Sequence, residues 1–137
     1  MSSGWERIRL RVETGETLEP AMPKDTRTLS THILDTSLGK AAVDVPLTVY
    51  RLLENQQWQE LKQAVTDKDG RASQLLETND FKSGIYKLQF NVQKYYDHLG
   101  VECFYPFIEI VVKCVAGQHY HIPLLLSPFG YTTYRGT

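Results

Sequence analysis

The chain has 137 residues, which suits a single domain, and its 15 basic and 16 acidic residues leave a net charge of −1 at neutral pH. This balance predicts neither a nucleic-acid-binding surface nor an anionic-membrane surface, and no apolar run approaches the roughly 20 residues that a membrane-spanning helix needs. The two cysteines, Cys103 and Cys114, are not spaced as a metal or redox motif. They could form one disulfide, but Cys114 alternates in phase with apolar residues, which favours a reduced core thiol.

Residues 1–28 are polar and rich in Glu and Thr, and they lack the apolar core of a secretory signal. Within them Ile8, Leu10 and Val12 alternate with arginines, a pattern that suits a short edge strand or a targeting segment. We expect instead a flexible N-terminal extension, with the domain boundary near residue 28 and one domain over residues 29–137.

The first predicted strand is Leu29–Asp35, in which His32 and Leu34 share one face. A turn follows at Gly39-Lys40. Apolar and polar residues then alternate over residues 45–50, which is typical of a half-buried strand.

Pro46 lies within this second strand, and since proline has no N–H to donate, we expect one edge of the strand to be unpaired. Trp58–Leu61 is predicted to form another short strand. The dipeptide Asp69-Gly70 predicts a tight hairpin turn.

The second half continues the pattern with a strand over Ile85–Phe90. A short helix over Val92–Leu99 is expected next, because Asn91 can cap its start and Gly100 stands where a helix ends. Phe107–Val115 is the clearest strand of the chain. About eight strands and one helix predict an antiparallel β-sandwich.

The last nineteen residues, 119–137, carry two of the four histidines. In a strand, His119 and His121 share one face with Pro123 and Leu125, whereas the other face is fully apolar and predicted to be core. A turn at residues 127–130 then leads into a last strand over Tyr131–Tyr134.

Only two histidines are placed for chemistry. We expect His98 to lie on the surface near the helix end and His119 to be peripheral. His32 and His121 occupy strand interiors opposite the apolar face; each alone would be a solvated side chain, but together with leucines and a proline they predict a lined cavity. No acid cluster completes a metal site and no nucleophile elbow is present, and composition alone leaves Arg71 an ordinary surface arginine.

Four motifs in order resemble the 5-hydroxyisourate hydrolases, the transthyretin-related enzymes of purine breakdown, over residues 29–137. They are Leu29-Ser-Thr-His-Ile-Leu-Asp35, Thr66-Asp-Lys-Asp-Gly-Arg71, His119-Tyr-His-Ile-Pro-Leu-Leu-Leu-Ser-Pro128 and the terminal Tyr134-Arg-Gly-Thr137. The family ends in serine, and this chain in threonine, which keeps the hydroxyl and adds a methyl group.

The resemblance implies an all-β, transthyretin-like antiparallel β-sandwich of two four-stranded sheets with one short helix. It also implies a homotetramer in which the histidine face lines a central channel. The family's catalytic positions correspond to His32, Arg71 and His121. Its substrate-binding positions correspond to His32, Arg71, Tyr134 and Thr137, with no metal and no cofactor.

The resemblance further implies ring opening of 5-hydroxyisourate by water to 2-oxo-4-hydroxy-4-carboxy-5-ureidoimidazoline. We hypothesise that His121 and His32 form a general-base relay and that Arg71 stabilises the oxyanion. The alternative is a transthyretin-type carrier of a hydrophobic hormone; transthyretins lack both channel histidines, the arginine and the Tyr-Arg-Gly end. A third option is an interaction scaffold without a ligand.

We expect a cytoplasmic protein. Arg9-Leu10 opens like the N-terminal peroxisomal signal, but Glu16-Thr17 stand where that signal has His-Leu or a close relative. The terminal Arg-Gly-Thr is not the Ser-Lys-Leu peroxisomal signal either. A peroxisomal location is therefore the second choice.

Overall fold

The computed structural model describes residues 28–137, so the predicted flexible extension lies, except for Thr28, outside the described residues. Thr28 is buried, and its hydroxyl donates a hydrogen bond to the carbonyl oxygen of Leu76 at 2.7 Å. Its own carbonyl accepts a bond from the N–H of Tyr120 at 2.8 Å. The folded unit therefore includes Thr28.

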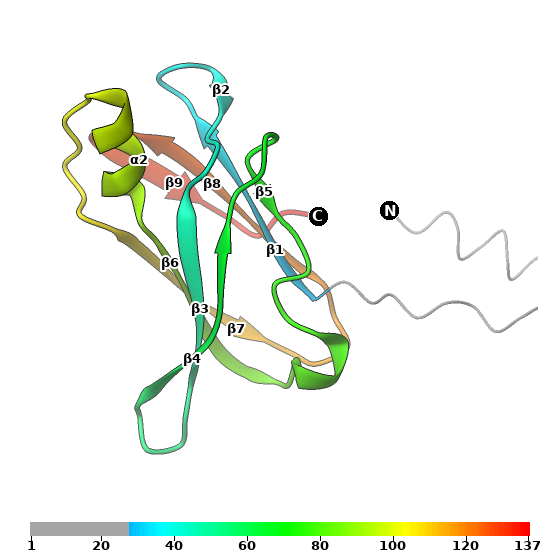
Figure 1. Ribbon diagram of the computed structural model, residues 1–137. Helices are drawn as coiled ribbons and strands as arrows, with labels where there is room; N and C mark the ends of the chain where they lie inside the picture. The colour runs from blue at the N-terminus through cyan, green and yellow to red at the C-terminus, as the bar shows by residue number, and fades with distance from the viewer. Residues whose placement is uncertain (1–27) are drawn as a thin grey trace, which may run out of the picture.

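The described residues form two packed sheets and one short helix (Figure 1), which confirms the predicted all-β sandwich. The first sheet has five strands rather than the expected four: β1 (Leu29–Asp35), β2 (Lys40–Ala41), β5 (Arg71–Ala72), β8 (Tyr120–Ser127) and β9 (Gly130–Thr133). The second has four: β3 (Pro46–Leu52), β4 (Trp58–Val65), β6 (Gly84–Phe90) and β7 (Ile108–Cys114). A 3₁₀ turn covers Thr78–Asp80, and the helix is α2 (Val92–Leu99).

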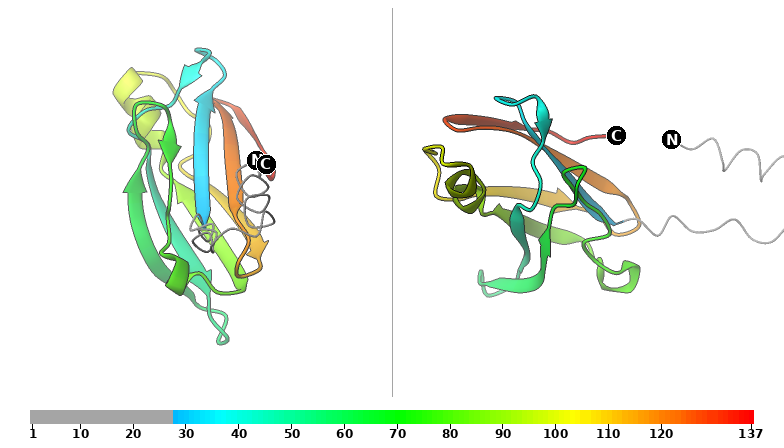
Figure 2. Two further views of the ribbon diagram at one scale, coloured as in Figure 1. Left: turned by 90° about the vertical axis from the view of Figure 1, so that its right-hand side faces the viewer. Right: turned by 45° about the horizontal axis from the view of Figure 1, so that its top comes forward.

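The strand pairs of the described chain are antiparallel, as predicted, with one exception. β1 and β8 run parallel in continuous register, from Leu29 beside Tyr120 to Asp35 beside Leu126, and Figure 2 shows them side by side. No hairpin joins them, since most of the domain lies between them in the sequence, so their direction is not fixed by a tight turn. This pairing brings the two predicted histidine strands into contact.

Alternation along the strands separates the core from an outer face. The inward side chains of β1 and β8 pack against those of the second sheet and are almost fully buried, among them Leu29, Ile33, Ile122 and Leu124. The sequence pattern predicts that the alternating apolar residues of the predicted strands form the core, and all of them are buried except Val112, which is half-buried: Val45, Leu47, Val49, Ile108, Ile110, Val112, Ile122 and Leu124. Because side chains point to alternate faces, His32 and His121 lie on the outer face of the first sheet.

Pro46 does not mark an edge strand. It is the first residue of β3, which pairs with β4 on one side and β6 on the other. The missing N–H therefore falls at the strand end, and the Pro46 carbonyl still accepts a bond from the N–H of Asn91 at 2.8 Å.

The predicted hairpin at Asp69-Gly70 is also wrong, although a turn forms there. The strand that follows, β5, pairs with β1 and not with β4. The carbonyl of Gly70 accepts the N–H of Ile33 at 2.8 Å, so the turn attaches to the histidine strand instead of closing a hairpin. A dipeptide signal predicts the turn but not the partner of the next strand.

The helix matches its prediction at both ends. The side chain of Asn91 accepts the N–H of Lys94 at 3.1 Å, and Gly100 ends α2 in the left-handed conformation with φ of 70°. Both cysteines are free, as predicted, and burial raises the pKa of the Cys114 thiol to about 11. Over residues 28–137, no helix has the length and apolar character required to cross a membrane.

Candidate functional site

His32 and His121 lie next to each other on the outer face of the first sheet. Their ring centroids are 6.5 Å apart, because His32 of β1 pairs with Pro123 and lies diagonal to His121 of β8. Rings whose centres are this far apart do not form a direct N–H···N bond, whose heavy atoms come within about 3 Å. The predicted shared face of these two histidines is confirmed.

A cavity of about 270 Å³ opens beside His121. Its walls are mostly polar and come from β1, from β5 and the residues after it, from β8 and the residue before it, and from the chain end: Ser30, Thr31, Arg71, Ser73, Gln74, His119, His121 and Thr137. Three predicted site residues, Arg71, His121 and Thr137, therefore meet in one space although they are far apart in the sequence.

The turn over residues 67–71 positions Arg71. The Asp67 carboxylate accepts the N–H groups of Asp69 at 2.8 Å and Arg71 at 2.9 Å, and these bonds lower the pKa of Asp67. Gly70 adopts a left-handed φ of 76°, and a Cβ there would lie 2.5 Å from the carbonyl oxygen of Ile33. Only glycine lets the turn approach β1 this closely, and the approach places Arg71 directly opposite His32.

The chain end continues from β9 alongside β8 (Figure 2). Gly136 donates its N–H to the carbonyl of His121 at 2.7 Å. A Cβ on Gly136 would lie 2.7 Å from Cδ2 of His121, so the main chain lies directly against the imidazole. Arg135 is fixed nearby, with its guanidinium carbon 4.3 Å from the centre of the Tyr120 ring and a bond to the carbonyl of His119 at 3.3 Å.

Electrostatics favour the neutral form of His121. Burial is the largest cause that lowers the pKa of its imidazole below 6.5, followed by the charges of His32, Arg71 and His119. A second contact fixes the ring, because Ser30 Oγ lies 2.8 Å from Nδ1. A neutral, oriented imidazole beside a guanidinium can accept a proton from water while developing negative charge is stabilised.

Two of the predicted site residues lie outside the wall of this cavity. His32 is half-buried and adjoins the cavity through its contact with His121. Tyr134 lines a different cavity, with Tyr120, Ile122 and residues of β7, because β9 ends at Thr133 and its alternation does not extend to Tyr134. The substrate-positioning role of Tyr134 stays a prediction.

Sequence reasoning missed several residues of the site. His119, expected to be peripheral, lines the cavity just before β8 begins. Ser30 and Gln74 line it as well. Ser30 precedes His32 by two residues and so shares its face, a signal that was present in the sequence; Gln74 follows β5 and carries no local signal.

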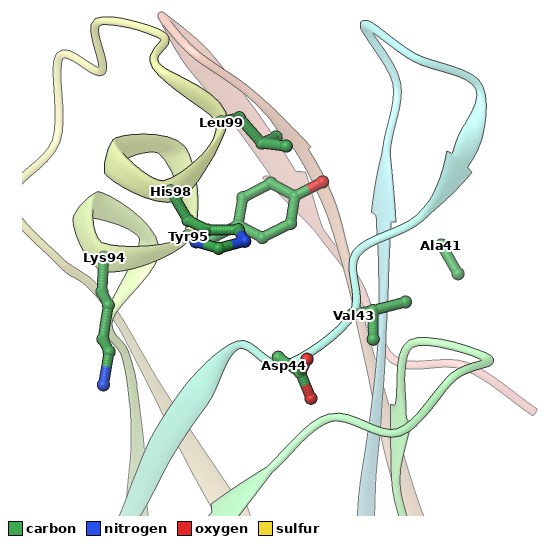
Figure 3. A pocket seen from close by; sticks show the side chains of 7 residues that line it. All are labelled: Ala41, Val43, Asp44, Lys94, Tyr95, His98 and Leu99. Atoms are coloured by element: carbon green, nitrogen blue, oxygen red, sulfur yellow. The ribbon is translucent and has the colours of Figure 1, made fainter.

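His98 lies away from this site. It lines a cavity between α2 and residues 41–44, where the side chains of His98 and Tyr95 extend toward Val43 (Figure 3). Among residues 28–137, no group of three or more His, Cys, Asp or Glu side chains is arranged to hold a metal ion.

The site residues and the sandwich can be compared with known proteins. The HIUase/Transthyretin family model matches residues 29–136. The chain belongs to the HIUase/Transthyretin family. Among family members, a Mus musculus protein named 5-hydroxyisourate hydrolase is 43% identical over 118 residues, covering 85% of this chain and 100% of its own length. A Schizosaccharomyces pombe protein named probable 5-hydroxyisourate hydrolase is 42% identical over 112 residues, covering 80% of this chain and 90% of its own.

Solved structures of transthyretin are also similar to this chain. Sea bream transthyretin in complex with thyroxine superposes with a TM-score of 0.76 and 32% sequence identity, covering 80% of this chain and 94% of the transthyretin chain. The same sandwich therefore occurs in proteins with different ligands, and the side chains of the outer face must distinguish between them.

Proposed function

We propose that this protein hydrolyses 5-hydroxyisourate to 2-oxo-4-hydroxy-4-carboxy-5-ureidoimidazoline, without a metal or cofactor. The observation that carries the proposal is the convergence of His32, Arg71 and His121 on one outer sheet face. The similarity to proteins named 5-hydroxyisourate hydrolase supplies the substrate.

In the proposed reaction His121 is the general base. Water is a poor nucleophile at neutral pH, and a histidine that is neutral at that pH can take its proton as it attacks. The lowered pKa of His121 keeps the ring in that form. His32, whose ring lies next to that of His121, passes the proton onward through a bridging water.

Arg71 stabilises the charge that develops on the attacked carbonyl. Its guanidinium carries several N–H donors in a planar arrangement that suits an oxyanion. The turn held by Asp67 and Gly70 fixes its backbone before substrate binds. Thr137, in the wall of the same cavity, contacts the substrate, and Tyr134 positions it once neighbouring chains complete the site.

The proposal includes a homotetramer. β7 and β9 each leave one edge unpaired within the described chain, and these edges can pair with a second copy. Large apolar side chains are exposed near them, including Phe104, Phe129 and Tyr131. The outer face itself adds little exposed apolar area, because Pro123 is buried and the chain end packs beside it, where a Cβ on Gly136 would lie 3.3 Å from Pro123 Cγ.

Carriage of a hydrophobic hormone fits the outer face less well. Apolar ligands are held in pockets lined mainly by hydrophobic and aromatic side chains. The cavity beside His121 instead presents Ser30, Arg71 and Gln74. Burying an apolar ligand there would desolvate charged and polar groups without replacing their hydrogen bonds.

The test is to generate 5-hydroxyisourate in situ from urate and to follow its ultraviolet decay with and without the protein. We expect faster decay with the wild type, and a rate lowered by about 10²–10⁴-fold in His121→Ala and in His32→Ala, the usual contribution of a general base. His98→Ala is the matched control and should retain the wild-type rate. Decay at the uncatalysed rate with wild-type protein would reject the proposal.

A further inference from the structure

Ser30 has no role in the reaction proposed above, yet it contacts the proposed base directly. Its Oγ lies 2.8 Å from Nδ1 of His121. Ser30 is only 9% exposed, and the parallel register places it beside His121 on the neighbouring strand. The sheet itself therefore holds this hydrogen bond.

The chain end holds a second edge of the same ring. Gly136 lies so close that a Cβ there would be 2.7 Å from Cδ2 of His121. If the imidazole flipped, Nδ1 would move away from Ser30 Oγ, and the opposite edge of the ring would face Gly136. Neither contact uses Nε2, the nitrogen through which the ring can take a proton from water.

The chemistry of His121 depends on which nitrogen carries the single proton of the neutral ring. A serine hydroxyl can accept a bond from Nδ1–H or donate one to a bare Nδ1. In the first arrangement Nε2 keeps its lone pair and can act as a base. In the second Nε2 is protonated and can only donate.

We propose that Ser30 is a positioning residue that accepts the Nδ1 proton of neutral His121 and so keeps Nε2 as the basic nitrogen. The proposal rests on the proposed hydrolase function, because that function needs a base at His121. It adds a residue 91 positions away in the sequence that decides whether this histidine is chemically competent.

The tautomer can be measured on the wild-type protein without an activity assay. In ¹⁵N NMR spectra of histidine-labelled protein above pH 7, a protonated Nδ1 and a bare Nε2 give separate pyrrole-type and pyridine-type signals. The His121 signals are assigned by their disappearance in His121→Gln. We expect the pyrrole-type signal on Nδ1; finding it on Nε2 would overturn the proposal. Because this readout is independent of turnover, a wild type that is inactive on 5-hydroxyisourate rejects the proposed function separately.

Variants then link the tautomer to the rate. Ser30→Ala should lower kcat by roughly 10- to 100-fold, as when groups that orient metal-bound histidines are removed, with little change in KM. Ser30→Ala should also shift His121 toward the other tautomer. Ser30→Thr keeps the hydroxyl group, so its kcat and its His121 tautomer should be those of the wild type. Ser127→Ala is the matched control, since Ser127 lies on β8 and donates one bond, to the carbonyl of Gly130 at 3.0 Å. A Ser30→Ala protein with unchanged kcat and unchanged ¹⁵N signals would disprove the role of Ser30.

Discussion

Arg71 and His121 influence each other through charge as well as through a shared cavity. The guanidinium is one of the causes that lower the pKa of His121, after burial and the charge of His32. A base is active only when unprotonated, so the rate falls as the pH drops through its pKa. The wild type should therefore keep its activity to a pH below 6.5, the ordinary value for histidine.

Replacing Arg71 by glutamine removes this positive charge, which raises the pKa of His121. The acid limb of the kcat/KM profile should move to higher pH, and the plateau should fall by about 10²–10³-fold as the oxyanion loses its donor. Arg71→Lys is the control: it keeps the charge, so its acid limb should stay at the wild-type pH, but it loses the planar fork and part of the plateau. An acid limb that did not move in Arg71→Gln would show that the two groups are not coupled.

At the residue scale, the sequence predicts well what strand alternation controls. His32 and His121 share a face because each lies at an outward position of a regular strand, and the 6.5 Å contact confirms it. Alternation along a strand over Tyr131–Tyr134 would put Tyr134 on the histidine face together with Thr132, but the regular strand ends at Thr133 and Tyr134 lines a different cavity. Strand alternation does place Ser30 on the face of His32, but the contact of Ser30 with His121 and the place of His119 in the cavity depend on the parallel pairing of β1 with β8, which no local pattern encodes.

The turn between β4 and β5 is the first element that can be tested by itself. Gly70→Ala should destabilise the protein in two ways, through a left-handed φ and through a Cβ that would lie 2.5 Å from the Ile33 carbonyl oxygen. The φ alone costs about 1–2 kcal/mol, and relief of the clash a further 1–3 kcal/mol or so. Since the turn carries Arg71, kcat/KM should fall too. Chemical denaturation and the hydrolysis assay measure the two effects.

Gly39 supplies the matched control for Gly70. It has a similar φ of 67°, but a Cβ there would meet nothing within 4 Å. Gly39→Ala should therefore show only the φ cost and wild-type activity. Equal losses of stability in the two variants would mean that the contact with Ile33 is relaxed without cost.

The chain end is the second element. The φ of Gly136 is not left-handed, so Gly136→Ala adds no backbone strain. Its Cβ, however, would lie 2.7 Å from His121 Cδ2 and 3.3 Å from Pro123 Cγ. We expect a displaced imidazole and a rate lowered by roughly 100-fold, since a misplacement of about 1 Å can cost that much. Thermal unfolding and the hydrolysis assay, run side by side, should show a larger effect on rate than on stability.

Gly130→Ala controls for adding a methyl group to this end of the sheet. Its nearest neighbour would be Ser127 Oγ at 3.7 Å, an ordinary contact. It should behave as wild type in both assays. If Gly136→Ala matched it in rate, the contact between the chain end and His121 would have no part in catalysis.

At the element scale, local signals predicted α2 and the longer strands to within a few residues, because alternation, the Asn91 cap and Gly100 act over short stretches of chain, but the two-residue strands β2 and β5 were missed. They did not predict which strands pair. The Asp69-Gly70 turn leads to β1 rather than back along β4, and Pro46 begins a central strand. Which strands pair depends on how all the strands of the domain pack together, so the pairing is a property of the whole fold.

For the whole molecule, the sandwich alone does not define the function. A thyroxine-bound transthyretin superposes on this chain with a TM-score of 0.76. Function depends on what the first sheet presents outward, and here that is a histidine pair and an arginine rather than an apolar wall. A face of this kind works best when a second copy covers it and excludes water, because charges interact more strongly in a dry site.

Assembly is the last prediction. Phe104, Phe129 and Tyr131 are exposed aromatic side chains on two neighbouring segments, which are joined by the bond from the Phe104 N–H to the Pro128 carbonyl at 2.8 Å and by the ring contact between Tyr105 and Tyr131; we call these three residues the aromatic patch. The patch adjoins the open edge of β9, so apolar area and unpaired backbone groups coincide there. Light scattering at micromolar concentration should give about four times the 15.7 kDa chain mass.

Phe129→Asp should lower that mass, since Phe129 is 64% exposed in the single chain and a buried, unpaired carboxylate in a subunit contact is strongly unfavourable. The matched control is Val65→Asp, at a side chain 55% exposed on β4, the edge strand of the other sheet. That variant should remain tetrameric. Because Phe129 lies outside the cavity that holds His121, a loss of activity in Phe129→Asp that follows the loss of mass would show that the site needs its neighbouring chains. Monomeric wild-type protein with full hydrolase activity would disprove this dependence.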